Sequence, residues 1–525
     1  MDLAHQIGQK LLLAFRGKES LSPEIVQAFQ SYHPSGVTLF RPFNIESPAQ
    51  IKKLNQSLQD LARELGLPLL LIGTDQEGGQ LMAFGDGTPL PGNMALGATR
   101  SPELARKAGE VLGRELAAIG VNVNYAPCAD VNINPNNPVV GVRSFGEDPK
   151  LVGELAAAMI EGIQSQGVAA TVKHFPGHGD TASDSHHGLG TVPHSRERLH
   201  SVELTPFRSA LQADAKLVMT AHLGILSIDG ESAPPATLSP NIINGLLRQD
   251  LGYTGVVITD AMDMHAIRQG ELLREDSLRA AQAGADILLM TTDPQDHMRA
   301  YESLLQGAQN GELSQENLRA SIDRIMQLKG WLAENATSPD LSVIQCAEHM
   351  AIANEIAEKS ITLVRDEKKY LPIRLEAEKR IAVIIPVPKD LTPADTSSYI
   401  QPKLAESIRA YHAQTDEFKM PYAPSEQDTS KVLEQVREYD VLIMGTINAY
   451  AEEKQAEFVR QLLQMGKPVI IIAMRLPYDL AVFPQSSTYV CTYGILEPSM
   501  RAVAKAVFGH SEMTGRLPVS IPGLE

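Results

Sequence analysis

The sequence predicts an α/β protein in which a (β/α)8 TIM-type barrel is followed by an αβα sandwich domain. Two observations predict it. Short apolar runs alternate with longer amphipathic stretches over roughly 330 residues, and the alternation then restarts after a polar break. Near-continuous apolar strands between helices are typical of a parallel sheet that is covered on both faces. The chain has 525 residues, more than one hydrophobic core usually supports, so more than one domain is expected.

The first domain is predicted from seven candidate strands with helical patterns between them. The candidate strands are Gly36–Phe40, Leu69–Asp75, Val121–Ala126, Ala169–Phe175, Leu217–His222, Val256–Asp260 and Ile287–Met290. The helical patterns include Pro102–Ile119, Lys150–Gln166, Glu203–Ala213 and Glu275–Ala283. About seven or eight such units fit a barrel of this type. A helix from about Ser314 to Asn335 closes the domain, and residues 336–340 form a linker.

The second domain is predicted from a helix and five further apolar runs. The helix covers Cys346–Ser360, and the runs are Ile361–Arg365, Ile381–Val387, Val441–Ile447, Val469–Met474 and Tyr489–Tyr493. About 170 residues is a typical domain size. We therefore expect a catalytic barrel over residues 1–338 and a separate α/β sandwich over residues 339–525.

Composition excludes several classes of function. The formal net charge is −17, and no run of Lys and Arg provides the basic face that nucleic-acid binding needs. The N-terminus shows no signal peptide, and the longest apolar runs are far too short to span a membrane. Three well-separated cysteines, Cys128, Cys346 and Cys491, are typical of buried thiols in a reducing compartment. A cytoplasmic protein without nucleic-acid or membrane partners is expected.

Four candidate strands end in residues that can do chemistry. Leu69–Thr74 leads into Asp75, Ala169–Val172 into Lys173 and His174, Leu217–Ala221 into His222, and Val256–Thr259 into Asp260. In a parallel barrel the carboxyl ends of all strands open onto one face, so these side chains should converge. A single aspartate at the end of a strand is often only the N-cap of the next helix. Four strands of one domain that each end in a reactive side chain indicate a functional site.

The segment from Pro176 to about Pro193 shows neither a helical nor a strand period. It is rich in Gly, Ser, Asp and His, and a stretch of this length without secondary structure is usually functional. Its histidines and carboxylates allow two interpretations. Asp184 could orient His186 for proton transfer, or the cluster could bind a divalent metal. The proton-transfer dyad is favoured, because no metal-ligand spacing such as His-Glu-x-x-His is present.

These residues suit glycosidic bond cleavage, although they do not by themselves single out sugars. The reaction needs a proton donor at the leaving oxygen, a nucleophile at the anomeric carbon and polar groups for the hydroxyls. Asp260 would be the nucleophile, and His186 would donate and then remove the proton. The groups expected to bind hydroxyls are Asp75, Arg143, Lys173 and His174.

The motifs resemble those of glycoside hydrolase family 3 β-N-acetylglucosaminidases over nearly the whole chain. They are KHFPGHGDT at residues 173–181, DSHHGL at 184–189, DQEGG at 75–79, NYAP at 124–127, RSFGEDP at 143–149, PATLS at 235–239, ITDAMDM at 258–264 and TGRLPV at 514–519. The resemblance implies a barrel followed by an α/β sandwich, Asp260 as nucleophile and an Asp184–His186 general acid/base. It also implies sugar binding by Asp75, Arg143, Lys173 and His174, and no metal or organic cofactor.

The implied activity is that of a retaining exo-β-N-acetylhexosaminidase acting on small glycosides that contain N-acetylglucosamine. Cell-wall muropeptide fragments are common substrates of the family, which suggests peptidoglycan recycling. The sequence departs from recycling enzymes at Gln80 and Ala83, where arginines are common, and neither residue replaces a guanidinium as a carboxylate partner. A phosphorolytic N-acetylglucosaminidase or β-glucosidase of the same fold stays open, as does a metal-dependent hydrolase that uses the His/Asp loop.

Overall fold

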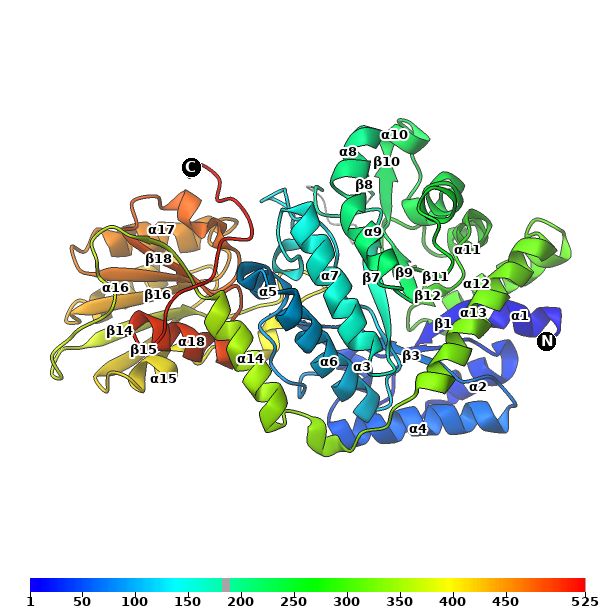
Figure 1. The fold of residues 1–525 in the computed structure, drawn as a ribbon, viewed down its shortest axis with the longest axis horizontal. Helices are drawn as coiled ribbons and strands as arrows, with labels where there is room; N and C mark the ends of the chain where they lie inside the picture. Colours follow the sequence, from blue (N-terminus) through cyan, green and yellow to red (C-terminus); the bar gives the residue numbers. More distant parts are fainter. Residues whose placement is uncertain (182–188, 525) are drawn as a thin grey trace.

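The first domain is a barrel of eight parallel strands, surrounded by helices (Figure 1). A computed structural model describes residues 1–181 and 189–524. The strands are β1 (Leu11–Ala14), β2 (Gly36–Thr38), β3 (Leu71–Thr74), β6 (Val123–Asn124), β7 (Ala169–Phe175), β9 (Leu217–Thr220), β11 (Val256–Thr259) and β12 (Leu288–Met290). They neighbour one another in chain order, and β1 pairs with β12. A parallel bridge between Ile258 and Ile287 nearly closes the ring.

All seven predicted strands of the barrel are present, and the sequence analysis missed the eighth, β1. This strand is the apolar run Leu11–Ala14, and all four of its residues are buried. It follows α1 (Leu3–Gly8) after only two residues. Because β1 is so short and lies so close to α1, its sequence is hard to distinguish from that of a buried helix. Periodicity alone cannot separate a short apolar strand from a helical segment.

The barrel helices begin with a recurrent pair, a Ser or Asp N-cap followed by proline. The side chains of Ser22, Ser47, Ser101, Asp148 and Asp293 each accept a backbone N–H of the first turn. Proline suits the position that follows, because its missing N–H would find no partner there. The helices that start in this way are α2 (Pro23–Tyr32), α4 (Pro48–Glu64), α6 (Pro102–Ala118), α7 (Pro149–Gln164) and α12 (Pro294–Gln309). The other main helices of the domain are α9 (Leu204–Gln212), α11 (Leu272–Ala283) and α13 (Gln315–Asn335).

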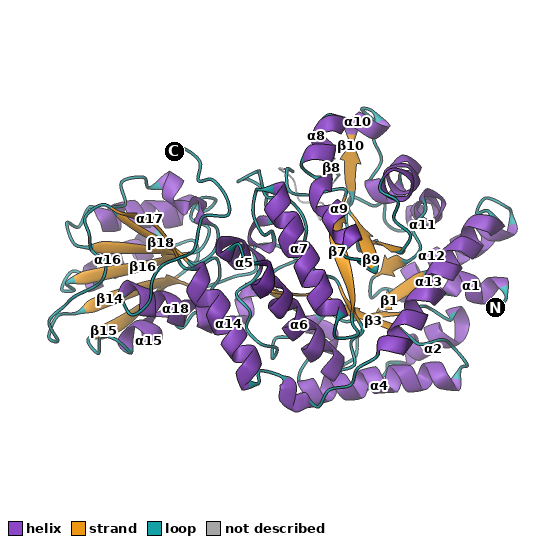
Figure 2. Ribbon diagram, in the orientation of Figure 1, coloured by secondary structure: helices purple, strands orange, loops and turns teal. Residues whose placement is uncertain are grey.

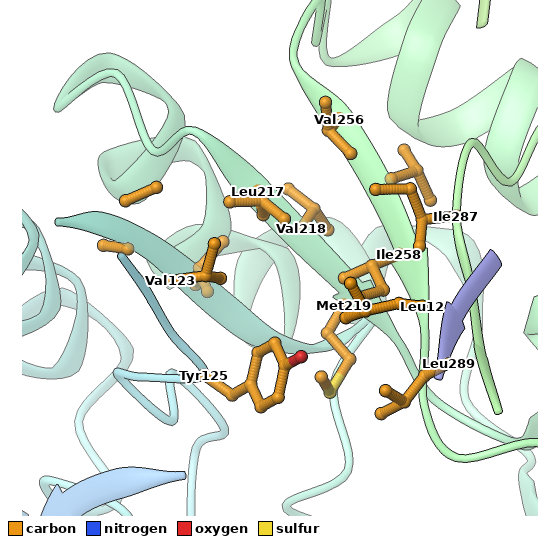
Figure 3. Close-up of a cluster of buried hydrophobic side chains, with 14 of the residues drawn as sticks. Leu12, Val123, Tyr125, Leu217, Val218, Met219, Val256, Ile258, Ile287 and Leu289 are labelled. Carbon is orange, nitrogen blue, oxygen red and sulfur yellow. The ribbon is translucent and has the colours of Figure 1, made fainter. Parts of the chain in front are cut away.

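Side chains from the strands fill the barrel interior (Figure 3). Tyr125 is completely buried, and its hydroxyl lies 2.7 Å from the Thr38 hydroxyl across the barrel. A Cβ on Gly73 would lie 2.2 Å from the Tyr125 hydroxyl oxygen, so glycine is needed where the two meet. The barrel is therefore a packed core rather than a channel, and a site has to form at one of its ends.

The second domain is a six-stranded sheet with helices on both faces (Figure 2). Its order is β13 (Thr362–Asp366), β18 (Thr488–Cys491), β17 (Val469–Ala473), β16 (Val441–Thr446), β14 (Ile381–Pro386) and β15 (Thr415–Met420), parallel except for β13. Its helices are α14 (Ala347–Ser360), α15 (Leu404–Arg409), α16 (Glu426–Gln435), α17 (Glu453–Leu463) and α18 (Glu497–Val507). The sequence analysis missed β15, an edge strand whose middle residues, Asp416 to Lys419, are polar or partly exposed.

Two hydrophobic clusters cover the two faces of this sheet. Along β14, Ala382 and Ile384 belong to one cluster, and Ile381 and Val383 belong to the other, as the alternation of a strand requires. The first cluster also contains Met94, Ala95 and Ala98 of α5 (Asn93–Thr99), which belongs to the first domain. The two domains thus share one apolar core. The predicted boundary between residues 338 and 339 falls between α13 and α14 and stays a prediction.

Among residues 1–181 and 189–524, no helix combines the length and apolar character that a membrane crossing requires.

Candidate active site

Most of the predicted site residues line one cavity of about 570 Å³ at the carboxyl ends of the barrel strands. Asp75 follows β3, Asp260 follows β11, Lys173 and His174 lie in β7, and Arg143 ends a helical turn at Gly141–Arg143. The convergence expected from their strand-end positions is therefore present. Asp184 and His186, the predicted proton-transfer pair, lie outside the described residues.

A buried ion-pair network holds the base of the cavity. The Lys173 ammonium lies 2.5 Å from an Asp75 carboxylate oxygen and 2.7 Å from Glu77 Oε1. Arg143 donates from Nε and Nη2 to the two Glu77 oxygens, at 2.9 and 2.7 Å. Burial alone would raise the pKa of Glu77, but the charges of Arg143 and Lys173 lower it to about 2. The network pairs the two carboxylates of Asp75 and Glu77 with the cations of Lys173 and Arg143.

Glu77 is a site residue that the sequence reasoning missed. It belongs to the short strand β4 (Gln76–Gly78), which pairs with β5 (Leu81–Met82), and its side chain is 2% exposed. Its position two residues beyond Asp75 places it on the same side of the chain. That spacing is the signal by which the sequence could have indicated it.

Asp130 is a second missed residue, and it organises the histidines. One carboxylate oxygen accepts the backbone N–H groups of His174 and His178, at 3.2 and 2.7 Å. The other lies 2.8 Å from His174 Nδ1 and 3.1 Å from the Cys128 thiol. Burial would raise the pKa of Asp130, but the neighbouring His174 holds it well below its ordinary value. The carboxylate thus fixes the orientation of the His174 ring, and Nε2 is the ring nitrogen that points away from Asp130.

His178 and His222 are buried near the site, and His178 also lines the cavity. Burial lowers the pKa of His178 to about 4, and its Nδ1 lies 2.8 Å from the Thr181 hydroxyl. His222 lies 2.8 Å from the Thr237 hydroxyl and 3.0 Å from the carbonyl of Ala261, the residue after Asp260. His222 thus supports the chain segment that carries Asp260.

Asp260 is half-buried at the end of β11 and lines the cavity. Its Oδ1 accepts the Ala261 N–H at 2.8 Å, and its own N–H donates to the Thr220 carbonyl of β9. These backbone contacts fix the start of the turn after the strand, and the Asp260 side chain lines the same cavity as Asp75 and Lys173.

The described residues on either side of 182–188 form a polar cluster. His194 Nε2 lies 2.6 Å from Asp180 Oδ2, and Arg198 lies 3.8 Å from Asp180 and 3.4 Å from Glu203. The short strand β8 (Gly190–Val192) pairs in parallel with β10 (Leu223–Ile225). The expectation that Pro176–Pro193 contains no strand is therefore wrong at its C-terminal end.

Two groups of described residues place their potential ligand atoms close enough together to hold a metal ion. The first is Cys128, Asp130 and His174, and the second is Asp180, His194 and Glu203. In the first group the side chains already hydrogen-bond to one another. In the second group the Arg198 guanidinium lies against two of the carboxylates. The ligand atoms of the first group therefore have partners without an ion, whereas neither Glu203 oxygen of the second group accepts a hydrogen bond among the described residues.

The second domain supplies the outer wall of the cavity. Six of its residues line the cavity: Asp390, Pro393, Ala394, Asp395, Thr396 and Tyr399. The Thr396 N–H and hydroxyl both donate to the Gln80 carbonyl at 2.8 Å, and the Gln80 amide donates to the Ala394 carbonyl. Gln80 therefore ties the 390–399 segment to the barrel, and the small side chain of Ala83 lines the cavity beside it. The sequence analysis missed this contribution, because it depends on how the domains pack.

Comparisons with known proteins agree with this architecture. Residues 3–328 match the glycosyl hydrolase family 3 N terminal domain, and residues 361–525 match the glycosyl hydrolase family 3 C-terminal domain. The chain is 31% identical to "Beta-hexosaminidase A" of Pseudoalteromonas piscicida, over 99% of this chain and 97% of the relative. It is 27% identical to a "Beta-N-acetylglucosaminidase/beta-glucosidase" of Cellulomonas fimi, over 86% of this chain and 83% of the relative.

A solved structure resembles the whole chain. It is a glycoside hydrolase family 3 β-N-acetylglucosaminidase from Paenibacillus sp. str. FPU-7, with a TM-score of 0.94, 36% identity and 99% of each chain covered. Both domains are thus matched in sequence and in arrangement. The chain belongs to glycosyl hydrolase family 3 and is a glycosidase.

Proposed function

We propose that this glycosidase is an exo-acting enzyme that releases terminal β-linked N-acetylglucosamine with retention of configuration. Asp260 is the proposed nucleophile, and Asp184 and His186 form the proposed general acid/base pair. The observation that carries the proposal is the half-buried Asp260 carboxylate, which faces the same cavity as Asp75, Lys173 and His174. A nucleophile and groups able to bind sugar hydroxyls are thereby within reach of one small substrate.

In the proposed first step, an Asp260 oxygen attacks the anomeric carbon as the bond to the leaving oxygen breaks. The His186 imidazolium donates its proton to that oxygen, so the aglycone leaves as an alcohol. The sugar is then held as an ester of Asp260. Asp184 accepts the other N–H of the imidazole and so holds the ring in one orientation.

In the proposed second step, water attacks the anomeric carbon, and His186 removes a proton from it. The bond to Asp260 breaks and the carboxylate is regenerated. Two successive inversions give the retained product. An imidazole is neutral while the ester exists, so it does not repel an incoming anion as a carboxylate would. This property keeps phosphate open as an alternative acceptor.

Four residues are proposed to bind the sugar. Asp75 accepts from hydroxyl groups, Lys173 donates to a neighbouring hydroxyl, and the His174 ring donates to or accepts from another. Arg143 can contribute chiefly through Nη1, because its Nε and Nη2 groups already bond Glu77. The preference for N-acetylglucosamine is supported by the names of the Paenibacillus and Cellulomonas relatives, and the Pseudoalteromonas relative is named as a hexosaminidase.

The test is turnover of a 4-nitrophenyl β-N-acetylglucosaminide, with the configuration of the first product read by NMR. We expect the β-anomer first, and we expect Asp260→Gly to lose nearly all turnover. Azide should rescue that variant and yield the α-glycosyl azide, because azide takes the face that the carboxylate has left. The exposed Asp323 on α13 offers a matched control, Asp323→Asn, with wild-type turnover. Undiminished activity of Asp260→Gly would show that the nucleophile lies elsewhere.

Three measurements separate the alternatives. A sugar 1-phosphate formed in the presence of phosphate identifies phosphorolysis. Loss of turnover after exhaustive chelation, restored by a divalent ion, identifies metal-dependent hydrolysis. Faster turnover of the aryl β-glucoside than of the N-acetylglucosaminide would favour a glucosidase, an activity named for the relative from Cellulomonas.

A further inference from the structure

Three potential metal ligands gather beside the barrel, outside the cavity of the proposed reaction. Asp180 lies in the turn after β7, His194 follows β8, and Glu203 directly precedes α9. Their ligand atoms all lie within 4.8 Å of one another, and none of the three residues lines the cavity. They meet because α9 packs on β7 and on α8 (Arg196–Ser201) (Figure 1). The cluster is therefore separate from the residues proposed to bind the sugar.

Glu203 is the member of this cluster whose carboxylate lacks hydrogen bonds. Its side chain is 3% exposed, and neither of its oxygens accepts a hydrogen bond from residues 1–181 or 189–524. Burying a carboxylate in this way is costly, because no donor replaces the water that it loses. A cation in direct contact with the two oxygens would offset that cost.

Tight packing holds the Glu203 side chain in place. A Cβ on Gly177 would lie 2.9 Å from the Glu203 Cβ. Gly177 also has a φ of 127°, a conformation that favours glycine. The close approach fixes the root of the Glu203 side chain against the turn that leads to Asp180. The carboxylate therefore cannot escape to water by a simple shift of the backbone.

Arg198 brings a positive charge to the cluster without satisfying the carboxylates. Its Nη2 atom lies 3.4 Å from Glu203 Oε1 and 3.8 Å from Asp180 Oδ2, and neither contact is a hydrogen bond. Its buried Nε has no hydrogen-bond partner in the described part of the chain either. Because the side chain is 36% exposed, the guanidinium can turn towards water when another cation takes its place.

The donor atoms of the cluster suit zinc. Zn²⁺ binds imidazole nitrogen and carboxylate oxygen at about 2.0–2.2 Å and favours four ligands in a tetrahedron. Glu203 can offer both oxygens, which brings the donors to four. Asp180 Oδ2 and His194 Nε2 lie 2.6 Å apart, whereas two ligands of one tetrahedral zinc ion lie about 3.3 Å apart. A small outward movement would exchange their hydrogen bond for two bonds to the ion, and the shared proton would be released.

We propose that Asp180, His194 and Glu203 form a structural zinc site that joins the turn after β7 to β8 and α9. The site goes beyond the proposed function and does not depend on it, because its ligands lie outside the cavity. The ion takes no part in bond cleavage. It replaces the long contacts of Arg198 with direct bonds to both carboxylates.

The test is zinc binding by the full-length chain after removal of metal, measured by titration calorimetry and by the melting temperature. Wild type should bind one Zn²⁺ and melt at a higher temperature with it. Glu203→Gln and His194→Gln should each weaken binding by about 100-fold or more, since losing a residue that only supports a ligand already costs about 10–100-fold. Arg198→Gln removes a competing cation and should strengthen binding by about tenfold.

A second pair of histidine and aspartate provides the matched control. His5 Nδ1 lies 2.7 Å from Asp2 Oδ1, but both side chains are more exposed than those of His194 and Asp180. His5→Gln should keep the zinc affinity of wild type. Co²⁺ gives an independent readout, because its visible absorption depends on its coordination. The bands of the Co²⁺-loaded wild type should be missing from Glu203→Gln, and if that variant does not fold, His194→Gln decides the same question.

The sign of the Arg198→Gln effect separates a metal site from a simple ion-pair cluster. If the carboxylates and Arg198 serve only one another, this variant melts at a lower temperature and zinc binds neither it nor wild type, which overturns the inference. Binding that survives Glu203→Gln and is lost in Cys128→Ser places the ion at the other group and also overturns it. Loss of turnover on removal of metal, reproduced by Glu203→Gln, would place the ion in the reaction and refute a structural role.

Discussion

Replacing Glu77 by glutamine would leave two buried cations without the carboxylate that they share. Glu77 accepts two bonds from Arg143 and lies 2.7 Å from the Lys173 ammonium. The amide has almost the same shape, so the substitution removes charge without creating a cavity. Asp75 remains as an anionic partner of Lys173. Arg143 loses its bidentate contact.

The size of the effect follows from the proton affinity of the buried carboxyl. Its pKa falls from an ordinary 4.5 to about 2, which corresponds to about 3 kcal/mol at about 1.4 kcal/mol per tenfold change. Loss of one partner of a buried ion pair typically costs about 3–5 kcal/mol, which agrees with this value. Because the folded-state pKa is depressed, this stabilisation is complete above pH 4.5 and is lost as the pH falls towards 2. At pH 3 about 1.4 kcal/mol of it should remain.

The assay is urea unfolding followed by tryptophan fluorescence. Trp331, the single tryptophan of the chain, lies in α13 of the barrel and therefore reports on the domain that contains Glu77. We expect Glu77→Gln to be less stable than wild type by about 3 kcal/mol at pH 7, with a smaller difference at pH 3. The control Glu64→Gln, at an exposed position on α4, should show neither effect. A loss below about 1 kcal/mol at pH 7, with no change in pH dependence, would refute the reasoning.

Two further substitutions test the surroundings of the site. Asp130→Asn should lower kcat/KM, and it should move the N–H of the His174 ring from Nδ1 to Nε2, because an amide N–H would then face Nδ1. Ring ¹⁵N chemical shifts measure the position of this N–H, and an unchanged position would contradict the prediction. Gly179→Ala should destabilise the protein by more than about 1 kcal/mol, because its Cβ would lie 1.8 Å from the Val131 carbonyl oxygen. The matched Gly330→Ala, on the exposed side of α13 with no atom within 4 Å, should instead stabilise the protein, by up to about 1 kcal/mol. Thermal unfolding compares the two, and equal melting temperatures would refute the steric argument.

Much of the fold could be predicted because buried parallel strands have a strong local pattern. Strands such as β7 and β16 are buried throughout, and the Ser/Asp-Pro pairs mark where helices begin. The two missed strands lack that pattern for opposite reasons. β1 is apolar but too short and too close to a helix. β15 lies at an edge of the sheet, and only its two end residues, Thr415 and Met420, are buried. Periodicity alone therefore distinguishes neither strand from the sequence around it.

The candidate site could be predicted where a polar residue lies at the carboxyl end of a strand or directly after it. Asp75, Lys173, His174 and Asp260 were found in this way, and all four line the cavity. Asp130 could not be found, because it follows no candidate strand and acts through hydrogen bonds to His174 and its neighbours. The 390–399 segment lies more than 300 residues from Gln80, and nothing local in its sequence indicates the contact. The proposed roles of Asp184 and His186 still rest on the sequence alone.

The apolar core shared by α5 and the second sheet has a consequence for how this chain can be divided or recombined. Met94, Ala95 and Ala98 are buried against residues of the second domain, so a fragment that ends after the barrel would present these side chains to water. A chimera that exchanges second domains between relatives must therefore exchange residues 93–99 with them. The second domain therefore packs as one unit with α5, and Val142 of the first domain belongs to the same cluster.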